Sequence, residues 1–167
     1  MHLHGRVHKY GDDVDTDVIL PGKYLSITDP KEMAPHCLEG IDPEFSRRVK
    51  PEDIVVAGQN FGSGSSREQA PLALLHSGVA CVVARSFARI FYRNAINLGL
   101  PILVCPEAVE AADNGEEMSI DLDAGVITTA GCTFRAAPFP HELQKLIEAG
   151  GLVLYVQQEL ARRAAQS

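Results

Sequence analysis

The chain has 167 residues, a formal net charge of −7 and a sequence pI near 5.3. That length fits one domain with a buried core, and the acidic balance disfavours nucleic acid or an anionic membrane as a partner. No apolar run approaches the ~20 residues that a membrane span needs, and no apolar signal-peptide segment opens the chain, so we expect a cytoplasmic protein.

The amino-terminal third of the chain is irregular. Residues 3–9 alternate weakly between apolar and polar, which predicts an edge strand. The acidic, turn-rich stretch YGDDVDTDVILPGKYL follows, and residues 28–52 carry many prolines and charges. Residues 31–40 form a short helix at best. A segment this irregular is long enough to indicate a functional loop.

The middle of the chain alternates between apolar runs and helical patterns. Strands are expected over 53–61, 79–85 and 100–105, with helices over 66–78 and 86–99 between them. Short connections between such elements favour a parallel sheet with right-handed crossovers. The runs are continuously apolar, which is typical of strands covered on both faces.

The carboxyl-terminal part changes pattern. Residues 118–129, MSIDLDAGVITT, predict a hairpin with its turn at 123–125. A short amphipathic helix is expected over 140–151, a strand over 152–156 and a frayed helix in the Ala/Arg-rich tail. The sequence therefore predicts one α/β domain, residues 1–167, in which a parallel central sheet carries additional antiparallel strands.

The cysteines do not form a recognisable ligand set. None of the four belongs to a Cys-x-x-Cys pair, so no zinc or iron–sulfur site is predicted on this chain. Two of them, Cys81 and Cys105, lie within apolar, strand-like runs, which predicts buried, reduced thiols. The four cysteines are Cys37, Cys81, Cys105 and Cys132.

A glycine- and serine-rich segment, GQNFGSGSSREQAP, joins the strand over 53–61 to the following helix. Ser65 and Glu68 match a capping box, with Ser65 as the N-cap. Capping does not explain Gly62 and Gly64, or why Arg67 lies in a first turn, where a cation opposes the helix dipole. A bound carboxylate or phosphate would explain all three, so capping and anion binding both remain open.

Three better-known motifs do not fit this segment. A Walker A loop requires Gly-Lys-Ser/Thr, but Arg67 and Glu68 stand there. The dinucleotide-binding fingerprint requires a third glycine at the position of Arg67. The residues around Gly64 also lack the order of a nucleophile elbow.

Three segments in this order resemble the small subunits of the aconitase superfamily: DDVDTDVILPGKYL, NFGSGSSREQAPLAL and ARSFARIFYRNAINLGLPIL. The resemblance covers nearly the whole chain and is nearest to the short small subunits of 3-isopropylmalate dehydratases. It implies the swivelling β/β/α fold, like the carboxyl-terminal domain of aconitase. It also implies a large partner subunit that carries a 4Fe–4S cluster, with no metal bound by this chain.

The resemblance implies a hydro-lyase that removes and re-adds water on a hydroxylated di- or tricarboxylate. In that family Ser65 is the base that takes the proton from carbon, and Ser66 and Arg67 bind a substrate carboxylate. Gly64 lets the backbone approach the substrate. Since a hydroxyl is a very weak acid, the N–H groups of the capped helix are expected to stabilise its anion.

The aspartates at 13, 15 and 17 have calcium-loop spacing, but the glycine and terminal glutamate that such a loop requires are missing. A solvated acidic turn is therefore expected for Asp12, Asp13 and Asp15. Asp17 differs, because by resemblance it lies in a Thr-Asp-hydrophobic motif near the active site. There it is expected to position the catalytic serine or the substrate.

The substrate-selecting loop of the family is similar in position to residues 24–27. Relatives that act on a substrate with an extra carboxylate place an arginine there. None of the residues here is charged, which favours an apolar substituent such as isopropyl. The four residues are Tyr24, Leu25, Ser26 and Ile27.

Several polar residues receive no site role from the sequence. Arg85, Arg89 and Arg93 are spaced by four and are expected to be structural or at the surface, although one could neutralise substrate charge. Gln69 stands where many family members have histidine. The histidines at 2, 4 and 8 are expected to be exposed, and those at 76 and 141 lie at helix ends.

The resemblance favours interconversion of 2-isopropylmalate and 3-isopropylmalate, a step of leucine biosynthesis. Homoaconitate hydratase and 2,3-dimethylmalate dehydratase share the motifs outside the loop and remain alternatives. A non-catalytic carboxylate-binding module is the rival from another class. The stoichiometry with the large subunit and the self-association of the chain are left open by the sequence.

Overall fold

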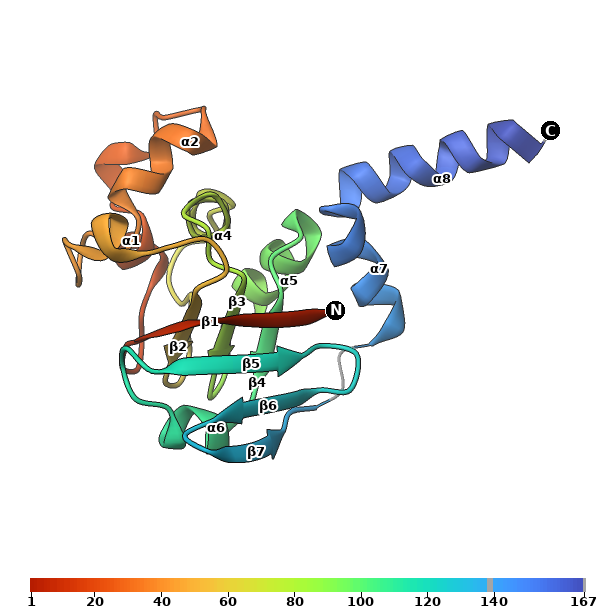
Figure 1. The fold of residues 1–167 in the computed structure, drawn as a ribbon. Coiled ribbons are helices and arrows are strands. Elements are labelled where there is room, and N and C mark those ends of the chain that lie inside the picture. Colours follow the sequence, from red (N-terminus) through yellow and green to blue (C-terminus); the bar gives the residue numbers. More distant parts are fainter. Residues whose placement is uncertain (138–139, 167) are drawn as a thin grey trace.

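A mixed seven-stranded sheet organises residues 1–137 and 140–166, which the computed structural model describes (Figure 1). Its strand order is β4-β3-β2-β1-β5-β6-β7. The first four strands run parallel, and β5, β6 and β7 are added in antiparallel fashion. The strands are β1 (His2–Lys9), β2 (Ile54–Ala57), β3 (Cys81–Ala84), β4 (Ile102–Val104), β5 (Glu117–Asp121), β6 (Val126–Thr129) and β7 (Cys132–Arg135).

The predicted parallel core with antiparallel additions is confirmed, but β1 is central and not an edge strand. Its first half, His2–Arg6, pairs with β5, and its second half, Val7–Lys9, pairs with β2. Each half therefore uses a different side of the strand. That division explains the weak alternation, because only the second half enters the two-sided core.

The helices vary greatly in length. Single turns dominate before β2, whereas the helices that follow β2 and β3 are longer. They are α1 (Thr16–Ile19), α2 (Pro30–Met33), α3 (Phe45–Arg48), α4 (Gln69–His76), α5 (Arg89–Leu98), α6 (Pro106–Ala111), α7 (His141–Ala149) and α8 (Leu152–Gln166), with 3-10 turns η1 (Gly22–Tyr24) and η2 (Ala34–His36). Strand β7 and helix α6 were not predicted.

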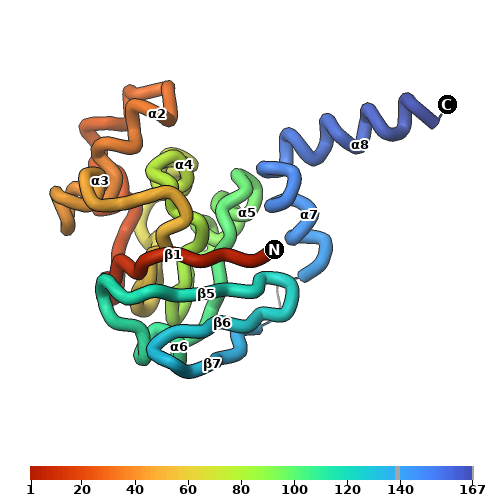
Figure 2. The backbone as a smooth tube through the Cα atoms, in the orientation of Figure 1, coloured from red at the N-terminus to blue at the C-terminus, as the bar shows by residue number. Residues whose placement is uncertain are grey.

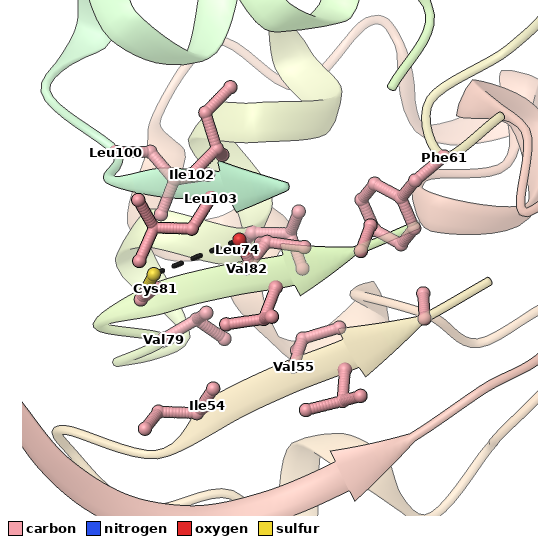
Figure 3. Close-up of a cluster of buried hydrophobic side chains, with 14 of the residues drawn as sticks. Ile54, Val55, Phe61, Leu74, Val79, Cys81, Val82, Leu100, Ile102 and Leu103 are labelled. Carbon is pink, nitrogen blue, oxygen red and sulfur yellow. Dashed lines mark hydrogen bonds between the residues drawn. The ribbon is translucent and has the colours of Figure 1, made fainter. Parts of the chain in front are cut away.

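The core lies around the parallel strands. All four residues of β2 and of β3 are buried, which agrees with their unbroken apolar sequences. Leu74 of α4 and Phe61 from the loop after β2 pack into the same cluster (Figure 3). By contrast, β5 and β6 alternate between buried and exposed residues, as strands with one open face do.

The carboxyl-terminal region corrects one prediction. Residues 152–156 are helical and open α8, which extends away from the rest of the chain (Figures 1 and 2). No side chain of the described part of α8 is buried. Its length and hydropathy, like those of the other helices in the described part, fall short of a membrane span.

The cysteines are all free, and Cys81 and Cys105 are buried as predicted, together with Cys37. Burial raises the pKa of the Cys37 thiol to about 12, with the hydroxyl of Ser77 opposing the shift, and burial also raises the pKa of the Cys81 thiol. Cys132 is exposed because it opens the outermost strand of the sheet.

His8 is buried, which corrects the expectation that it is exposed. Its Nε2–H donates to Asp53 Oδ2 over 2.8 Å, and its ring meets Phe45 edge-on. Burial by itself raises the pKa of Asp53. Hydrogen bonds from His8 and from the backbone N–H groups of Lys50 and Arg6 outweigh burial, so the pKa lies below its ordinary value.

Candidate active site

Three loops at the carboxyl ends of β1, β2 and β3 run side by side and are joined by backbone hydrogen bonds. The loop after β2 lies in the middle. On one side Gly62 N–H donates to Val14 C=O over 2.7 Å, and Thr16 N–H donates to Ser63 C=O over 2.8 Å. On the other side Ala88 N–H donates to Phe61 C=O over 3.0 Å. The glycine–serine segment is thus a loop held by its neighbours at the carboxyl ends of the parallel strands, which is where parallel sheets bind their ligands.

Two glycines give this loop its shape. Gly62 has φ +85°, and a Cβ there would lie 2.2 Å from Phe91 Cγ. Gly64 has φ +92°, a conformation that side chains rarely adopt. The loop therefore packs against α5 at a distance that only glycine allows.

The predicted capping box is wrong. Helix α4 begins at Gln69, its N-cap is Glu68, and no side chain caps it. Ser65 lies four residues before Gln69 and its side chain is exposed. The carbonyl of Ser65 accepts a hydrogen bond from Thr16 Oγ1 over 3.0 Å. Ser65 is therefore positioned by the loop, and the dipole of α4 does not act on it as it would on an N-cap.

Ser65, Ser66 and Arg67 line a hollow of about 240 Å³ together with Gly64. The first turn of α5 forms its opposite wall, where Arg89 joins the lining and no side chain caps the helix. The uncapped N–H groups of a helix start and two guanidinium groups make this hollow suited to an anion. Anion binding is thus supported, but at the start of α5 and not of α4.

Asp17 contacts Arg67 and not Ser65. Its Oδ1 accepts from Gly22 N–H over 2.8 Å and lies 3.4 Å from Arg67 Nη1. Arg67 is mostly buried, with 21% of its side chain exposed, whereas Asp17 is 66% exposed. Asp17 therefore ties Arg67 to the start of the predicted substrate-selecting loop.

A second hollow, of about 520 Å³, adjoins the first. Leu25 and Ile27 of the predicted substrate-selecting loop line it, with Met33 of α2 and Leu72 of α4. Glu68 is the one charged residue among those that line it. Uncharged polar side chains complete the lining: Thr28, Ser66, Gln69 and Asn94. The second hollow therefore offers apolar contacts to an uncharged group and no cation to a carboxylate.

The other two residues of that loop do not reach the second hollow. Tyr24 stacks on His36, with ring centroids 3.7 Å apart and planes inclined by 12°. Ser26 is exposed and absent from the lining. Half of the predicted loop thus faces the hollow, because the 3-10 turn Gly22–Tyr24 points Tyr24 elsewhere.

The acidic turn is structural. Asp12 Oδ1 accepts from Gln59 N–H over 2.7 Å, and Asp15 caps α1 by accepting from Val18 N–H over 2.8 Å. Asp13 accepts from the side chain of Asn60 over 3.2 Å. In residues 1–137 and 140–166 no group of three or more His, Cys, Asp or Glu side chains could hold a metal ion.

From the sequence, Asn94 was overlooked and neither Arg89 nor Gln69 received a definite site role. Arg89 lines the first hollow, whereas Arg85 lines a different one and Arg93 is exposed and lines neither. Asn94 lines both the first and the second hollow, and Gln69 lines the second. No local signal separates Asn94 from the other polar residues of α5, such as Arg93.

Comparison with known proteins gives a consistent result. The family model described as the Aconitase C-terminal domain matches residues 13–107. The chain is 55% identical to a 3-isopropylmalate dehydratase small subunit of Lachnoclostridium phytofermentans, over 96% of this chain and 98% of that protein. It is 57% identical to a 2,3-dimethylmalate dehydratase small subunit of Eubacterium barkeri, over 93% of this chain and 97% of that one.

A solved structure agrees with both. The crystal structure of a 3-isopropylmalate dehydratase from Methanocaldococcus jannaschii superposes with a TM-score of 0.95 and 44% identity, covering 100% of each chain. The mixed α/β fold, with its curled sheet, is thus shared with a relative of this family across the whole length.

Proposed function

Because the chain belongs to the Aconitase C-terminal domain family, we propose that it is the small subunit of a 3-isopropylmalate dehydratase. Such a hydro-lyase interconverts 2-isopropylmalate and 3-isopropylmalate through a dehydrated intermediate, a step of leucine biosynthesis. Residues 1–167 then form one swivelling domain. The observation that carries the proposal is a hollow suited to an anion beside a second hollow whose lining includes apolar side chains and no cation.

The substrate is a dianion, and the first hollow has the groups to bind it. Arg67, held by Asp17, and Ser66 bind one carboxylate. The guanidinium of Arg89 and the start of α5 make the same hollow electropositive. The contact with Asp17 orients Arg67 before the substrate arrives, which reduces the ordering that binding requires.

Ser65 takes the proton from carbon, the electron pair of that C–H bond forms the double bond, and the hydroxyl leaves the neighbouring carbon as hydroxide. A proton from solvent or from the partner's side of the site converts the hydroxide to water. The alkoxide of Ser65 needs stabilisation. The sequence predicted that the amino terminus of α4 would stabilise it, whereas we assign this role to the amino terminus of α5. The uncapped first turn of α5 and the nearby guanidinium of Arg67 favour a negative charge in this hollow. Asp17 acts on this chemistry through Arg67, as a positioning residue.

The second hollow receives the substituent that distinguishes the substrates. Isopropyl fits a lining of Leu25, Ile27, Met33 and Leu72, whereas a third carboxylate, as in homocitrate, would meet Glu68 and no cation. The smaller methyl groups of 2,3-dimethylmalate can contact the same apolar side chains. Since a relative of that name is 57% identical, 2,3-dimethylmalate is the second candidate substrate.

The chain acts with a large subunit, which its relatives' designation as small subunits implies. A 4Fe–4S cluster on that subunit would supply the Lewis acid that the departing hydroxyl requires. The four cysteines of this chain do not fit such a group, since Cys37, Cys81 and Cys105 are buried and Cys132 stands alone. The cluster therefore belongs on the partner.

The test is anaerobic reconstitution with a large subunit and its cluster. Ultraviolet absorbance of the unsaturated intermediate is followed with 3-isopropylmalate, 2,3-dimethylmalate and homocitrate in parallel. The proposal predicts turnover of 3-isopropylmalate that requires both subunits. Turnover of dimethylmalate alone would favour the second candidate, and turnover of homocitrate would contradict the role of the second hollow. Carboxylate binding by the chain without any turnover would favour a non-catalytic module.

A further inference from the structure

Asn94 and Ser66 are the two residues that line both hollows. Asn94 belongs to α5, and Ser66 belongs to the loop that precedes α4, which packs against α5. A molecule whose charged part occupies the first hollow and whose apolar part occupies the second must pass between these two side chains. Their position is therefore the junction of the site.

The geometry of α5 directs the Asn94 side chain toward this junction. Asn94 lies four residues after Ile90 and three after Phe91, so the three share one face of the helix. The Cα–Cβ bonds of a helix tilt toward its amino terminus. The carboxamide of Asn94 is thus aimed toward the uncapped first turn of α5, which forms the wall of the first hollow.

The carboxamide has no fold-stabilising contact to explain it. Within residues 1–137 and 140–166, the half-buried side chain of Asn94 makes no hydrogen bond to another residue. Asparagine is also a poor residue for a helix interior. An amide offers two donor hydrogens and an acceptor oxygen without adding charge, which suits contact with a carboxylate beside an apolar surface.

We propose that Asn94 binds the substrate, an inference that rests on the proposed function. Its Nδ2–H donates to the substrate carboxylate that Ser66 also binds. That contact fixes the carboxylate at the junction and turns the substituent of the adjacent carbon into the second hollow. Asn94 is then the residue of α5 that divides the charged part of the substrate from its apolar part.

The test uses the reconstituted enzyme with Asn94→Ala and Asn94→Asp. A hydrogen bond to a charged group accounts for about a ten- to hundredfold change in binding. We expect KM for 3-isopropylmalate to rise by about that factor in Asn94→Ala, with a smaller change in kcat. Asn94→Asp should bind more weakly still, because two carboxylates then meet, and its KM should fall as the pH is lowered.

Asn97→Ala is the matched control, since Asn97 lies one turn further along α5 and lines neither hollow. Its KM should stay within about twofold of the wild-type value, within the scatter of surface substitutions. Wild-type KM in Asn94→Ala would overturn the inference, as would loss of subunit assembly in Asn94→Ala, since a substrate contact is not needed for assembly. A wild-type enzyme inactive on every malate derivative would instead overturn the proposed function, and the inference with it.

Discussion

Replacing Gly62 by alanine tests how tightly the catalytic loop is fitted to α5. The residue has φ +85°, and the new Cβ would lie 2.2 Å from Cγ and 2.4 Å from Cβ of Phe91. Positive φ costs a side chain about 1–2 kcal/mol, and overpacking costs about 1–3 kcal/mol more. We therefore expect Gly62→Ala to lower the free energy of unfolding by about 2–5 kcal/mol.

Gly115→Ala separates the two contributions. Gly115 has φ +88°, but nothing lies within 4 Å of the position that its Cβ would take. Only the cost of positive φ, about 1–2 kcal/mol, should appear there. The unfolding free energies come from denaturant titration of the two variants. Equal losses in both would refute the claim that the loop is pressed against Phe91.

The same substitution reaches the site through α5. Because Cβ of Phe91 is itself too close, shortening Phe91 to alanine cannot relieve the contact, and the helix must shift. That shift would displace Arg89 and Asn94 from the hollow. Gly62→Ala should therefore lose activity in the reconstituted enzyme, whereas Gly115→Ala should keep it.

Three further predictions concern the site, the buried pair and the thiols. Asp17→Asn should raise KM by about two- to fivefold with little loss of stability, because an ion pair whose carboxylate is largely exposed to solvent is worth about 0–1 kcal/mol. An unchanged KM would contradict the positioning role of Asp17. Asp53→Asn should lower the free energy of unfolding by about 1.5–3 kcal/mol. The pKa of Asp53 is lowered on folding, so this stability is complete above the unfolded pKa and is lost as the pH falls through the folded pKa. The difference in unfolding free energy between wild type and variant should therefore shrink below about pH 4, and a difference independent of pH would contradict the lowered pKa of Asp53. Of the four thiols, only that of Cys132 should react rapidly with an aromatic disulfide reagent in the native chain, whereas all four should react after denaturation. Rapid reaction of more than one native thiol would contradict the burial of the other three cysteines.

The sheet could be predicted from sequence because its strands are short apolar runs between clear helical patterns. The edge position of β1 could not be excluded, since its two halves pair with different neighbours 40 or more residues away. The prediction of a strand over residues 152–156 was wrong for a different reason. A run of five apolar residues is compatible with either a strand or a helix, and only the continuous helix through the tail decides between them.

The sequence predicted which residues of the loop form the site, but not how the loop and the helices are arranged around them. Ser65, Ser66, Arg67 and Gly64 do line one hollow. The capping pattern of Ser65 and Glu68 was nevertheless misleading, because hydrogen bonds to residues 14–16 hold the loop through Ser65 and the helix begins only at Gln69. The contribution of α5 depends on tertiary packing, which local spacing does not encode.

The most direct test of the account is turnover by the reconstituted enzyme with Ser65→Ala, compared with Ser63→Ala. Ser63 lies in the same loop but does not line the hollow, so it is the matched control. If Ser65 is the base, its variant should assemble with the large subunit and lose at least about a hundredfold in turnover of 3-isopropylmalate. Ser63→Ala should remain active. Wild-type turnover in Ser65→Ala would contradict the account at its centre.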